Sequence, residues 1–315
     1  MVMIREEASW NGSVLAAEQD IPLRLGPRLA ALAELVTQEM AAVQGEGGNP
    51  WRTLADIGSD HAYLPAYLLR QGVVDKGIAT DVNEGPFRNI LRTVEICGLR
   101  ECLEARRGDG LTVLRPGEAG CIVMAGMGGA TMAKILCDGA AVTDQALSLV
   151  LQPQNAFERI CRVLLDAGWQ LAEETLAEEN RETYRLMAWR CGTWFCEHAP
   201  GGVAGGEDRK SGEDRDALAR PWNMADIDEY ITRWREQACP ASDAGIFARC
   251  IWHLGPRNIA RRDESLREPA GLELERLVRA ATGLGRSERN ENEGRRREVA
   301  AAITVWEGLL KWLFP

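Results

Sequence analysis

Hydrophobic and polar positions in the first two thirds of the chain follow two alternating periods. Short apolar runs that predict β-strands occupy residues 52–57, 76–81, 102–107, 121–125 and 147–151. Stretches with helical spacing lie between them, near 62–71, 84–97, 129–138 and 154–167. Two more strand-like runs, "WQLAEETL" and "YRLMAW", then follow one another. Strands that alternate with helices predict an α/β fold with a doubly wound, Rossmann-like sheet of seven strands.

The segments on either side of this region are predicted to be helical. Residues 21–43 have the apolar spacing of an amphipathic helix. Beyond residue 226, apolar positions step by three and four over 274–284 and again over 299–313. One apolar seam on each of two helices predicts a C-terminal α-helical domain built as a coiled-coil-like hairpin.

These patterns divide the chain into three parts. The α/β domain is expected over residues 21–196, and the helical hairpin domain over 226–315. Residues 197–225 are rich in glycine and charge and offer almost nothing to bury, which predicts a flexible insertion or linker. With 315 residues and 45% hydrophobic content, the chain is long enough for two domains with a proper core.

Several classes of protein are disfavoured by composition. No apolar run reaches the roughly 20 residues that span a bilayer, and the first residues lack the apolar segment of a signal peptide. The nine cysteines contain no C-x-x-C pair, which is more typical of reduced thiols than of zinc sites or disulfides. We therefore expect a cytoplasmic protein without a bound metal or a membrane partner.

The net charge of −10 argues at first against a nucleic-acid partner. The acidic excess, however, lies entirely before Asp226, because basic and acidic residues are equal in number from there on. The cluster Arg295–Arg297 is open to two interpretations, a solvated helix face or a set of phosphate contacts. Charge alone therefore does not exclude RNA.

The first candidate binding loop is the stretch "LADIGSDHAYLP". In a doubly wound sheet, ligands bind outside the carboxyl ends of the strands. Asp56 ends the first strand, Gly58-Ser59 allows close backbone approach, and Asp60 and His61 open the next helix. Carboxylates repel a pyrophosphate but accept a cation, so S-adenosylmethionine suits this loop better than NAD, whose G-x-G-x-x-G motif is absent. The structural alternative is that these residues only turn the chain and begin a helix.

The second strand ends in "IATDVNEGP", which places Asp81 at the next strand end with Val82 and Asn83 behind it. An acid about 20 residues after the glycine loop commonly binds ribose hydroxyls. We therefore expect these three residues to contact the ribose side of the donor.

The third and fourth strands end in "RRGDGL" and "VMAGMGGAT". Asp109, followed by Gly110, is placed to accept from an adenine amino group, or alternatively to cap a helix. Ala125, Gly126 and Met127 form a glycine turn whose backbone can face the reacting centre, although its glycines also suit tight packing.

The motifs "ADIGSDHAYLP", "DVNEGP", "GDGL", "AGMGG" and "LVLQP" closely resemble those of the bacterial tRNA (adenine-N1)-methyltransferases that modify position 22. The resemblance covers most of residues 21–190 and becomes looser after 197. "LGPRNIARRDESL" at 254–266 is similar to the family's Gly-Pro segment before its helical hairpin. The resemblance implies an S-adenosylmethionine donor, a tRNA acceptor methylated at adenine N1, and a hairpin domain that helps to hold the tRNA.

The candidate site follows from the motifs and the resemblance together. The expected cofactor-binding residues are Asp56, Gly58, Ser59, His61, Asp81, Val82, Asn83, Asp109, Gly110, Ala125 and Gly126. Adenine N1 carries an in-plane lone pair and needs no strong base, so catalysis consists of alignment and of easing the positive charge of the product. The catalytic candidates are the Asp60 carboxylate and the carbonyls of Gly126 and Met127.

Two other functions remain open on the sequence alone. A methyltransferase of the same fold could act on another RNA or on a protein, and a relative without catalysis could bind RNA only. The intact acids at the strand ends argue against the second. The pattern leaves the oligomeric state open, and a monomer is compatible with it.

Overall fold

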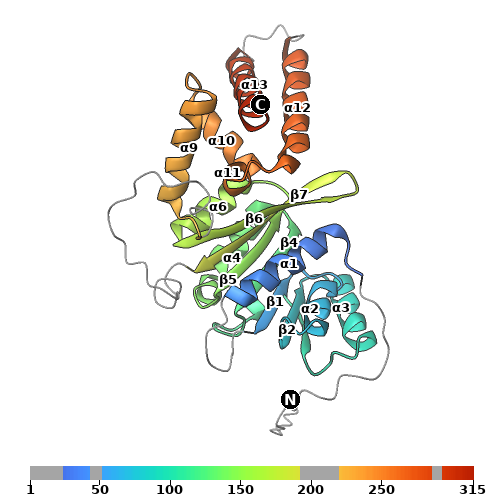
Figure 1. Ribbon diagram of the computed structural model, residues 1–315. Coiled ribbons are helices and arrows are strands. Elements are labelled where there is room, and N and C mark those ends of the chain that lie inside the picture. The colour runs from blue at the N-terminus through green and yellow to red at the C-terminus, as the bar shows by residue number, and fades with distance from the viewer. Residues whose placement is uncertain (1–23, 43–51, 192–219, 286–292) are drawn as a thin grey trace, which may run out of the picture.

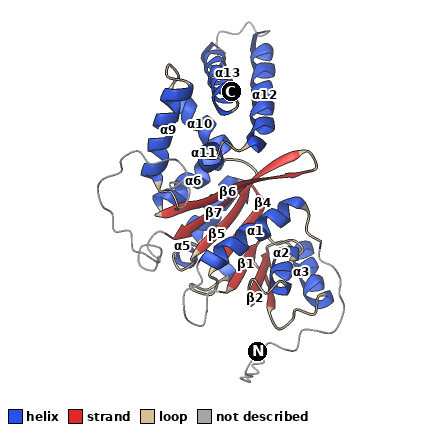
Figure 2. Ribbon diagram, in the orientation of Figure 1, coloured by secondary structure: helices blue, strands red, loops and turns tan. Residues whose placement is uncertain are grey.

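The computed structural model of the chain describes residues 24–42, 52–191, 220–285 and 293–315. At its centre is a seven-stranded sheet in the order β3-β2-β1-β4-β5-β7-β6 (Figure 2). The strands are β1 (Thr53–Ile57), β2 (Lys76–Asp81), β3 (Leu103–Arg107), β4 (Cys121–Met127), β5 (Ser148–Pro153), β6 (Trp169–Glu179) and β7 (Glu182–Cys191). The first five run parallel, and β7 is antiparallel to both neighbours. The predicted Rossmann-like sheet is thus confirmed, and its strand order reverses between β1 and β4.

Helices cover both faces of the sheet. They are α1 (Pro27–Ala42), α2 (Tyr63–Arg70), α3 (Glu84–Ile96), α4 (Gly129–Asp138), α5 (Ala140–Thr143) and α6 (Phe157–Asp166). Successive strand residues point to opposite faces. Leu54 therefore packs with α1 and α2, whereas its neighbour Ala55 belongs to the core beneath α4 and α6.

The hairpin of β6 and β7 is longer than the sheet beside it (Figure 1). β5 pairs with β7 only between Met187 and Arg190, so the tip of the hairpin projects past the carboxyl end of β5. The two-residue turn Asn180-Arg181 closes it with φ angles of 55° and 65°, typical of a type I′ turn. The tip consequently stands over the edge of the sheet that carries the candidate motifs.

In the described residues after the sheet, the α-helices are α9 (Met224–Ala238), α10 (Ala244–Leu254), α11 (Pro256–Ala260), α12 (Arg267–Gly285) and α13 (Glu293–Leu313). α12 and α13 lie side by side as the expected hairpin (Figure 1). The sequence analysis singled out only the seams of this pair, but α9 and α10 also bury apolar residues at helical spacing: Ile227, Ile231 and Trp234 in α9, and Phe247, Cys250 and Leu254 in α10. None of the described helices combines the length and the apolar character that crossing a membrane requires.

The predicted linker 197–225 needs one correction. Residues 197–219 lie outside the described part of the chain, but Trp222 is fully buried and pairs with Leu171 of β6. Asn223 then caps α9 through its side chain. The last residues of the predicted linker are therefore ordered, because a large indole was available to bury against the sheet edge.

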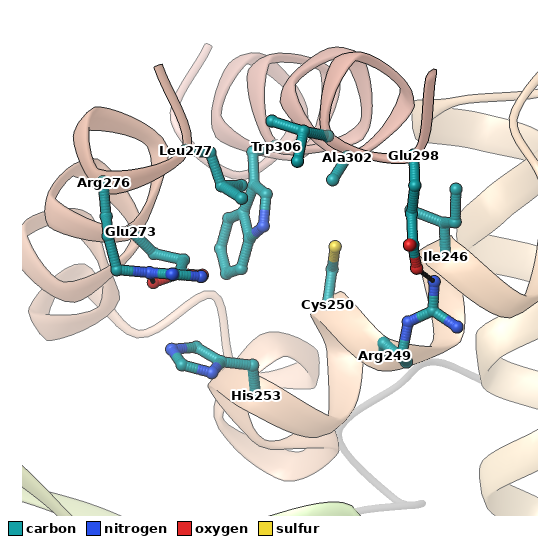
Figure 3. A pocket seen from close by; sticks show the side chains of 11 residues that line it. Ile246, Arg249, Cys250, His253, Glu273, Arg276, Leu277, Glu298, Ala302 and Trp306 are labelled. Atoms are coloured by element: carbon teal, nitrogen blue, oxygen red, sulfur yellow. Dashed lines mark hydrogen bonds and ion pairs between the residues drawn. The ribbon is translucent and has the colours of Figure 1, made fainter. Parts of the chain in front are cut away.

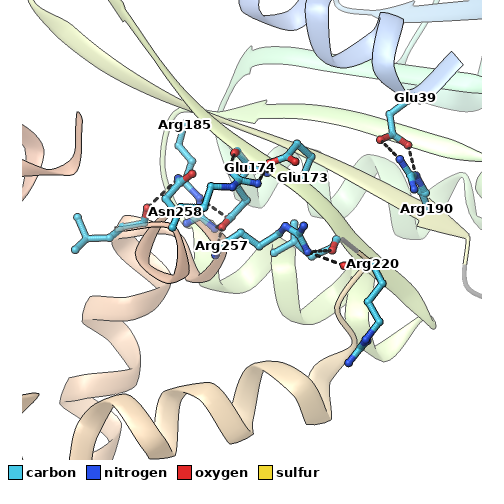
Figure 4. Close-up of polar contacts among 11 residues, drawn as sticks. Glu39, Glu173, Glu174, Arg185, Arg190, Arg220, Arg257 and Asn258 are labelled. Atoms are coloured by element: carbon cyan, nitrogen blue, oxygen red, sulfur yellow. Dashed lines mark hydrogen bonds and ion pairs between the residues drawn. The ribbon is translucent and has the colours of Figure 1, made fainter. Parts of the chain in front are cut away.

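A buried polar cluster joins the C-terminal helices to the sheet (Figure 4). Glu174 of β6 accepts from the Arg185 guanidinium of β7, through Nε at 2.9 Å, and from the backbone N–H of Arg257 in α11 at 2.7 Å. Burial lowers the pKa of Arg257, whose guanidinium also lies over the Trp222 ring. The helices and the sheet thus share one desolvated hydrogen-bond network.

Candidate active site

Two acids lie together where β1 and β2 end. Asp56 and Asp81 are only 6% and 8% exposed, and parallel pairing brings their strand ends to the same edge. The Ser59 hydroxyl donates to the Asp56 carboxylate at 2.5 Å, and the Asn83 backbone N–H donates to that of Asp81 at 2.9 Å. The structure therefore assembles four of the predicted cofactor-binding residues at one place.

Asp56 is held in an environment that disfavours its negative charge. Burial raises the pKa of this carboxyl to about 6; the hydrogen bond from Ser59 opposes the shift, and the neighbouring Asp81 charge adds to it. A bound cation would stabilise the ionised Asp56 carboxylate against both its burial and the repulsion from Asp81, whereas a bound anion would add to the repulsion. The electrostatics favour a positively charged ligand group.

The turn after β1 requires glycine. Gly58 has a φ of 73°, and a Cβ at this position would lie 2.8 Å from the Met127 methyl group. The backbone N–H groups of Gly58 and Ser59 both donate to the Thr80 carbonyl at 2.9 Å. The β1 turn is thereby fixed against β2 and brought close to the β4 turn.

The other predicted residues surround this centre and are more accessible. Val82 is exposed, and so is Asp109, whose side chain makes no capping hydrogen bond at the short 3-10 helix that begins at Gly110. His61 stacks on Tyr63 with ring centroids 5.1 Å apart, and its Nε2 lies 3.5 Å from the Asp60 carboxylate. Asp109 is therefore available to a ligand. The packing of His61 on Tyr63 agrees with the alternative that His61 only begins the helix.

Ala125, Gly126 and Met127, predicted as a glycine turn, are instead the last residues of β4, where the pairing with β5 is irregular at Gly126 (the β4 turn). This irregularity depends on Gln152, which lies in the motif "LVLQP" but was given no role. Gln152 is the residue before the last of β5, opposite Ala125 in the sheet register, and is almost fully buried. Its Oε1 accepts from the backbone N–H of Gly126 and from Arg28 Nη1, both at 3.1 Å, and its Nε2 donates to the Pro153 carbonyl. A polar residue at the end of the apolar run "SLVLQP" was the available signal for Gln152. No local pattern pointed to Arg28, because its hydrogen-bonding partners are distant in sequence.

A cleft of about 650 Å³ opens beyond Gln152. Its walls are the carboxyl end of β5, the tip of the β6–β7 hairpin with Tyr184, and α12. The Arg28 guanidinium lies 5.3 Å from the centre of the Tyr184 ring and pairs with Glu179 at 3.5 Å. The cleft is thus joined to the β4 turn through Gln152 and Arg28.

A second pocket, of about 300 Å³, lies between α10, α12 and α13 (Figure 3). Cys250 and Trp306 line its apolar part, and His253, Glu273 and Arg276 also line the cleft. Burial lowers the pKa of His253, so this shared wall carries a neutral imidazole at physiological pH. In the described residues, no group of His, Cys, Asp and Glu is placed to hold a metal ion.

Known proteins resemble this chain over the sheet and over the C-terminal helices. A tRNA (adenine(22)-N(1))-methyltransferase of Bacillus subtilis strain 168 is 36% identical over 170 residues, which is 54% of this chain and 66% of that protein. The crystal structure of the B. subtilis m1A22 tRNA methyltransferase TrmK superposes with a TM-score of 0.64 at 25% identity, covering 91% of this chain and 99% of that one. TrmK of M. capricolum, in complex with S-adenosyl-homocysteine, has the same fold, with a TM-score of 0.58 at 15% identity over 92% and 99% of the two chains.

The family model described as "Methyltransferase domain" matches residues 25–187. This range contains every strand-end motif, from the Asp56 loop to the Gly126 turn, and also Gln152 and the β6–β7 tip. The match extends over more than half of the chain and coincides with the observed sheet, so the protein belongs to the methyltransferase domain family.

Proposed function

We propose that the protein transfers a methyl group from S-adenosylmethionine to N1 of an adenine in tRNA, with position 22 as the target. The observation that carries this proposal is the cation-favouring edge around Asp56 and Asp81, in a chain 36% identical to a tRNA (adenine(22)-N(1))-methyltransferase. The alignment spans 66% of that relative's length, and the remaining correspondence rests on the shared helical region.

The residues at the sheet edge fit this donor chemically. S-adenosylmethionine supplies an electrophilic methyl group on a sulfonium centre. Asp81 would hold its ribose hydroxyls and Asp109 its adenine amino group, with the exposed Val82 beside the ring. Asp56 would face its positively charged groups. The acceptor nitrogen already carries its lone pair, so the chain has to position the base and exclude water rather than remove a proton.

The Gly126 turn and the cleft suit that positioning role. Gly126, with a φ of 72°, stands between the donor edge and the cleft, so its carbonyl and that of Met127 are candidates to ease the positive charge of the methylated ring. Asp60 is a further candidate from the adjacent loop. An adenine normally engaged in pairing must leave its stack to reach this place.

The direct test is product analysis. A tRNA transcript with adenine at position 22, incubated with the protein and labelled S-adenosylmethionine, is expected to yield N1-methyladenosine on mass spectrometry of its nucleosides. Replacing this adenine by guanine should abolish the product. Methylated protein, methylation at another tRNA position, or donor binding without any methylated product would each contradict the proposal.

The raised pKa of Asp56 makes donor binding dependent on pH. A positively charged donor binds the ionised carboxylate better, so affinity is expected to be constant above about pH 7 and to fall as pH drops through 6. Below that point the loss approaches tenfold per pH unit until binding to the protonated form dominates. Calorimetric titration between pH 5 and 8 measures this dependence.

Two variants serve as controls for the pH experiment. Asp56→Asn should bind weakly and independently of pH. Asp81→Asn should bind weakly but keep a pH dependence from Asp56, shifted to lower pH because the Asp81 charge no longer raises the pKa of Asp56. Equal wild-type affinity at pH 5 and pH 8 would remove Asp56 from the contact with the positive charge.

A further inference from the structure

The cleft beside Gln152 has the position and size for a nucleotide of the acceptor. Its volume of about 650 Å³ lies within the range of small-molecule sites. Gln152 lines it and also accepts from the Gly126 N–H, so the cleft opens directly next to the turn that faces the reacting centre. The cleft therefore offers a path for RNA that delivers an adenine to this turn.

Two arginines in the cleft stand out because their charge is not compensated. Arg181 lies at the tip of the β6–β7 hairpin and Arg279 on α12, so they belong to opposite walls. Within the described parts of the chain, neither has an ion pair or a hydrogen-bonding partner. By contrast, the lining residue Arg276 is paired with Glu273.

The other lining charges are Arg185, which is buried against Glu174, and Glu182. The Glu182 carboxylate accepts from the Tyr184 hydroxyl at 2.7 Å and keeps its negative charge, because the hydroxyl is neutral. With Arg181 and Arg279 set against the single carboxylate of Glu182, the cleft has a net positive charge in a chain whose net charge is −10.

The backbone at Arg181 supports a role for its side chain. Its φ of 65° lies in the left-handed region, and the second position of a type I′ turn strongly prefers glycine. An arginine at this position has an unfavourable backbone conformation, a cost that local folding does not explain. A ligand for the guanidinium does explain it.

The arginine cluster of the hairpin domain is less available than the sequence suggested. Arg296 donates from Nε and Nη2 to the Leu284 carbonyl at 3.0 and 2.7 Å, and Arg297 pairs with Glu293. Arg296 therefore joins α13 to α12, Arg297 pairs within α13, and only Arg295 of the cluster is exposed with no partner among the described residues. Arg181 and Arg279 in the cleft are therefore better placed than this cluster to contact phosphates near the Gly126 turn.

We propose that the cleft holds the tRNA strand flanking the target adenine, with Arg181 and Arg279 contacting backbone phosphates from opposite walls. The inference rests on the proposed function and adds to it the path of the acceptor strand on this chain. Charge complementarity favours RNA as the occupant, and none of the acids expected to bind S-adenosylmethionine lines the cleft.

The test compares three double variants with the wild type. Arg181→Gly/Arg279→Ala removes both charges, and glycine after Asn180 is the pair that a type I′ turn prefers, so the fold is spared. Arg181→Lys/Arg279→Lys keeps the charges. Arg92→Ala/Arg100→Ala removes two exposed arginines in and after α3, outside the cleft, and matches the change in net charge.

Binding of a tRNA transcript with adenine at position 22 is measured at four salt concentrations, and donor binding by calorimetry. The cleft variant is expected to bind tRNA roughly tenfold more weakly at 0.15 M salt, with a log–log salt slope flatter by about 1.5, for two lost phosphate contacts. Donor affinity, the lysine variant and the α3 control should remain near wild type.

The outcomes separate this proposal from the proposed function. If the wild type methylates the transcript but the cleft variant keeps the wild-type slope, the cleft assignment is wrong and the activity stands. A lysine variant as weak as the cleft variant, or an equal loss in the α3 control, also overturns the assignment. If the wild type produces no N1-methyladenosine, the proposed function itself fails.

Discussion

Replacing Glu174 by alanine is expected to lower the free energy of unfolding by about 3–5 kcal/mol, the usual cost of leaving one member of a buried ion pair without its partner. The side chains of Glu174 and Arg185 are 0% and 3% exposed. Glu174→Ala leaves the Arg185 guanidinium without a carboxylate and the backbone N–H of Arg257 without an acceptor. Urea unfolding followed by circular dichroism measures the loss.

The neighbouring Glu173 provides a matched control. It also pairs with an arginine, Arg261, but both side chains are nearly one third exposed. Glu173→Ala should therefore cost no more than about 1 kcal/mol, since water screens this pair. The double variant Glu174→Met/Arg185→Met should be more stable than Glu174→Ala because it buries no orphaned charge. Equal losses for Glu173→Ala and Glu174→Ala would show that the buried network of Glu174 adds no more stability than the exposed pair of Glu173.

Replacing Gln152 by leucine is expected to reduce kcat for methyl transfer by roughly 100-fold, because a shift of about 1 Å at a reacting centre has effects of this size. Leucine fills a similar volume but accepts no hydrogen bond. The Gly126 N–H and Arg28 Nη1 then lose the acceptor they share. The donor acids Asp56 and Asp81 are untouched, so the dissociation constant of S-adenosylmethionine should change by less than about threefold. Single-turnover kinetics and calorimetry measure the two quantities.

Gln152→Glu is the conservative companion of this variant. A carboxylate accepts from both Gly126 and Arg28, so the turn should keep its geometry and a larger part of the rate should return. If Gln152→Leu turns over at the wild-type rate, the Gly126 turn does not depend on this side chain. If both variants lose donor binding, Gln152 belongs to the donor site instead.

Much of the fold was predictable because its signals are local. Alternation of apolar and polar residues marked all seven strands near their observed positions. The turn after β1 and the irregularity near the end of β4 have positive φ angles, so Gly58 and Gly126 marked them in the sequence. Parallel strands bring their carboxyl ends to one edge, so Asp56 and Asp81 were expected to meet and do so. Their binding roles stay predictions for the experiments above.

The helical region was predicted less completely. The seams of α12 and α13 were singled out, whereas the shorter seams of α9 and α10, with Ile231 and Trp234 or Cys250 and Leu254 at helical spacing, were not. Trp222 lies in a segment whose composition is typical of a linker, yet it is fully buried against β6. Composition describes the average character of a segment, whereas the burial of Trp222 depends on one contact between its side chain and the sheet.

The sequence by itself determined the strands, the main helices and the acids and glycines at the strand ends, because these depend on residues close together in the chain. The tertiary structure alone decided which distant residues share the site. Arg28 meets Gln152 across 124 positions and Glu179 across 151. Arg181 and Arg279 lie on opposite walls of one cleft only because the β6–β7 hairpin extends past β5 and α12 packs beyond its tip. Contacts between residues so distant in sequence follow from strand register and helix packing, which the local spacing of residues does not determine.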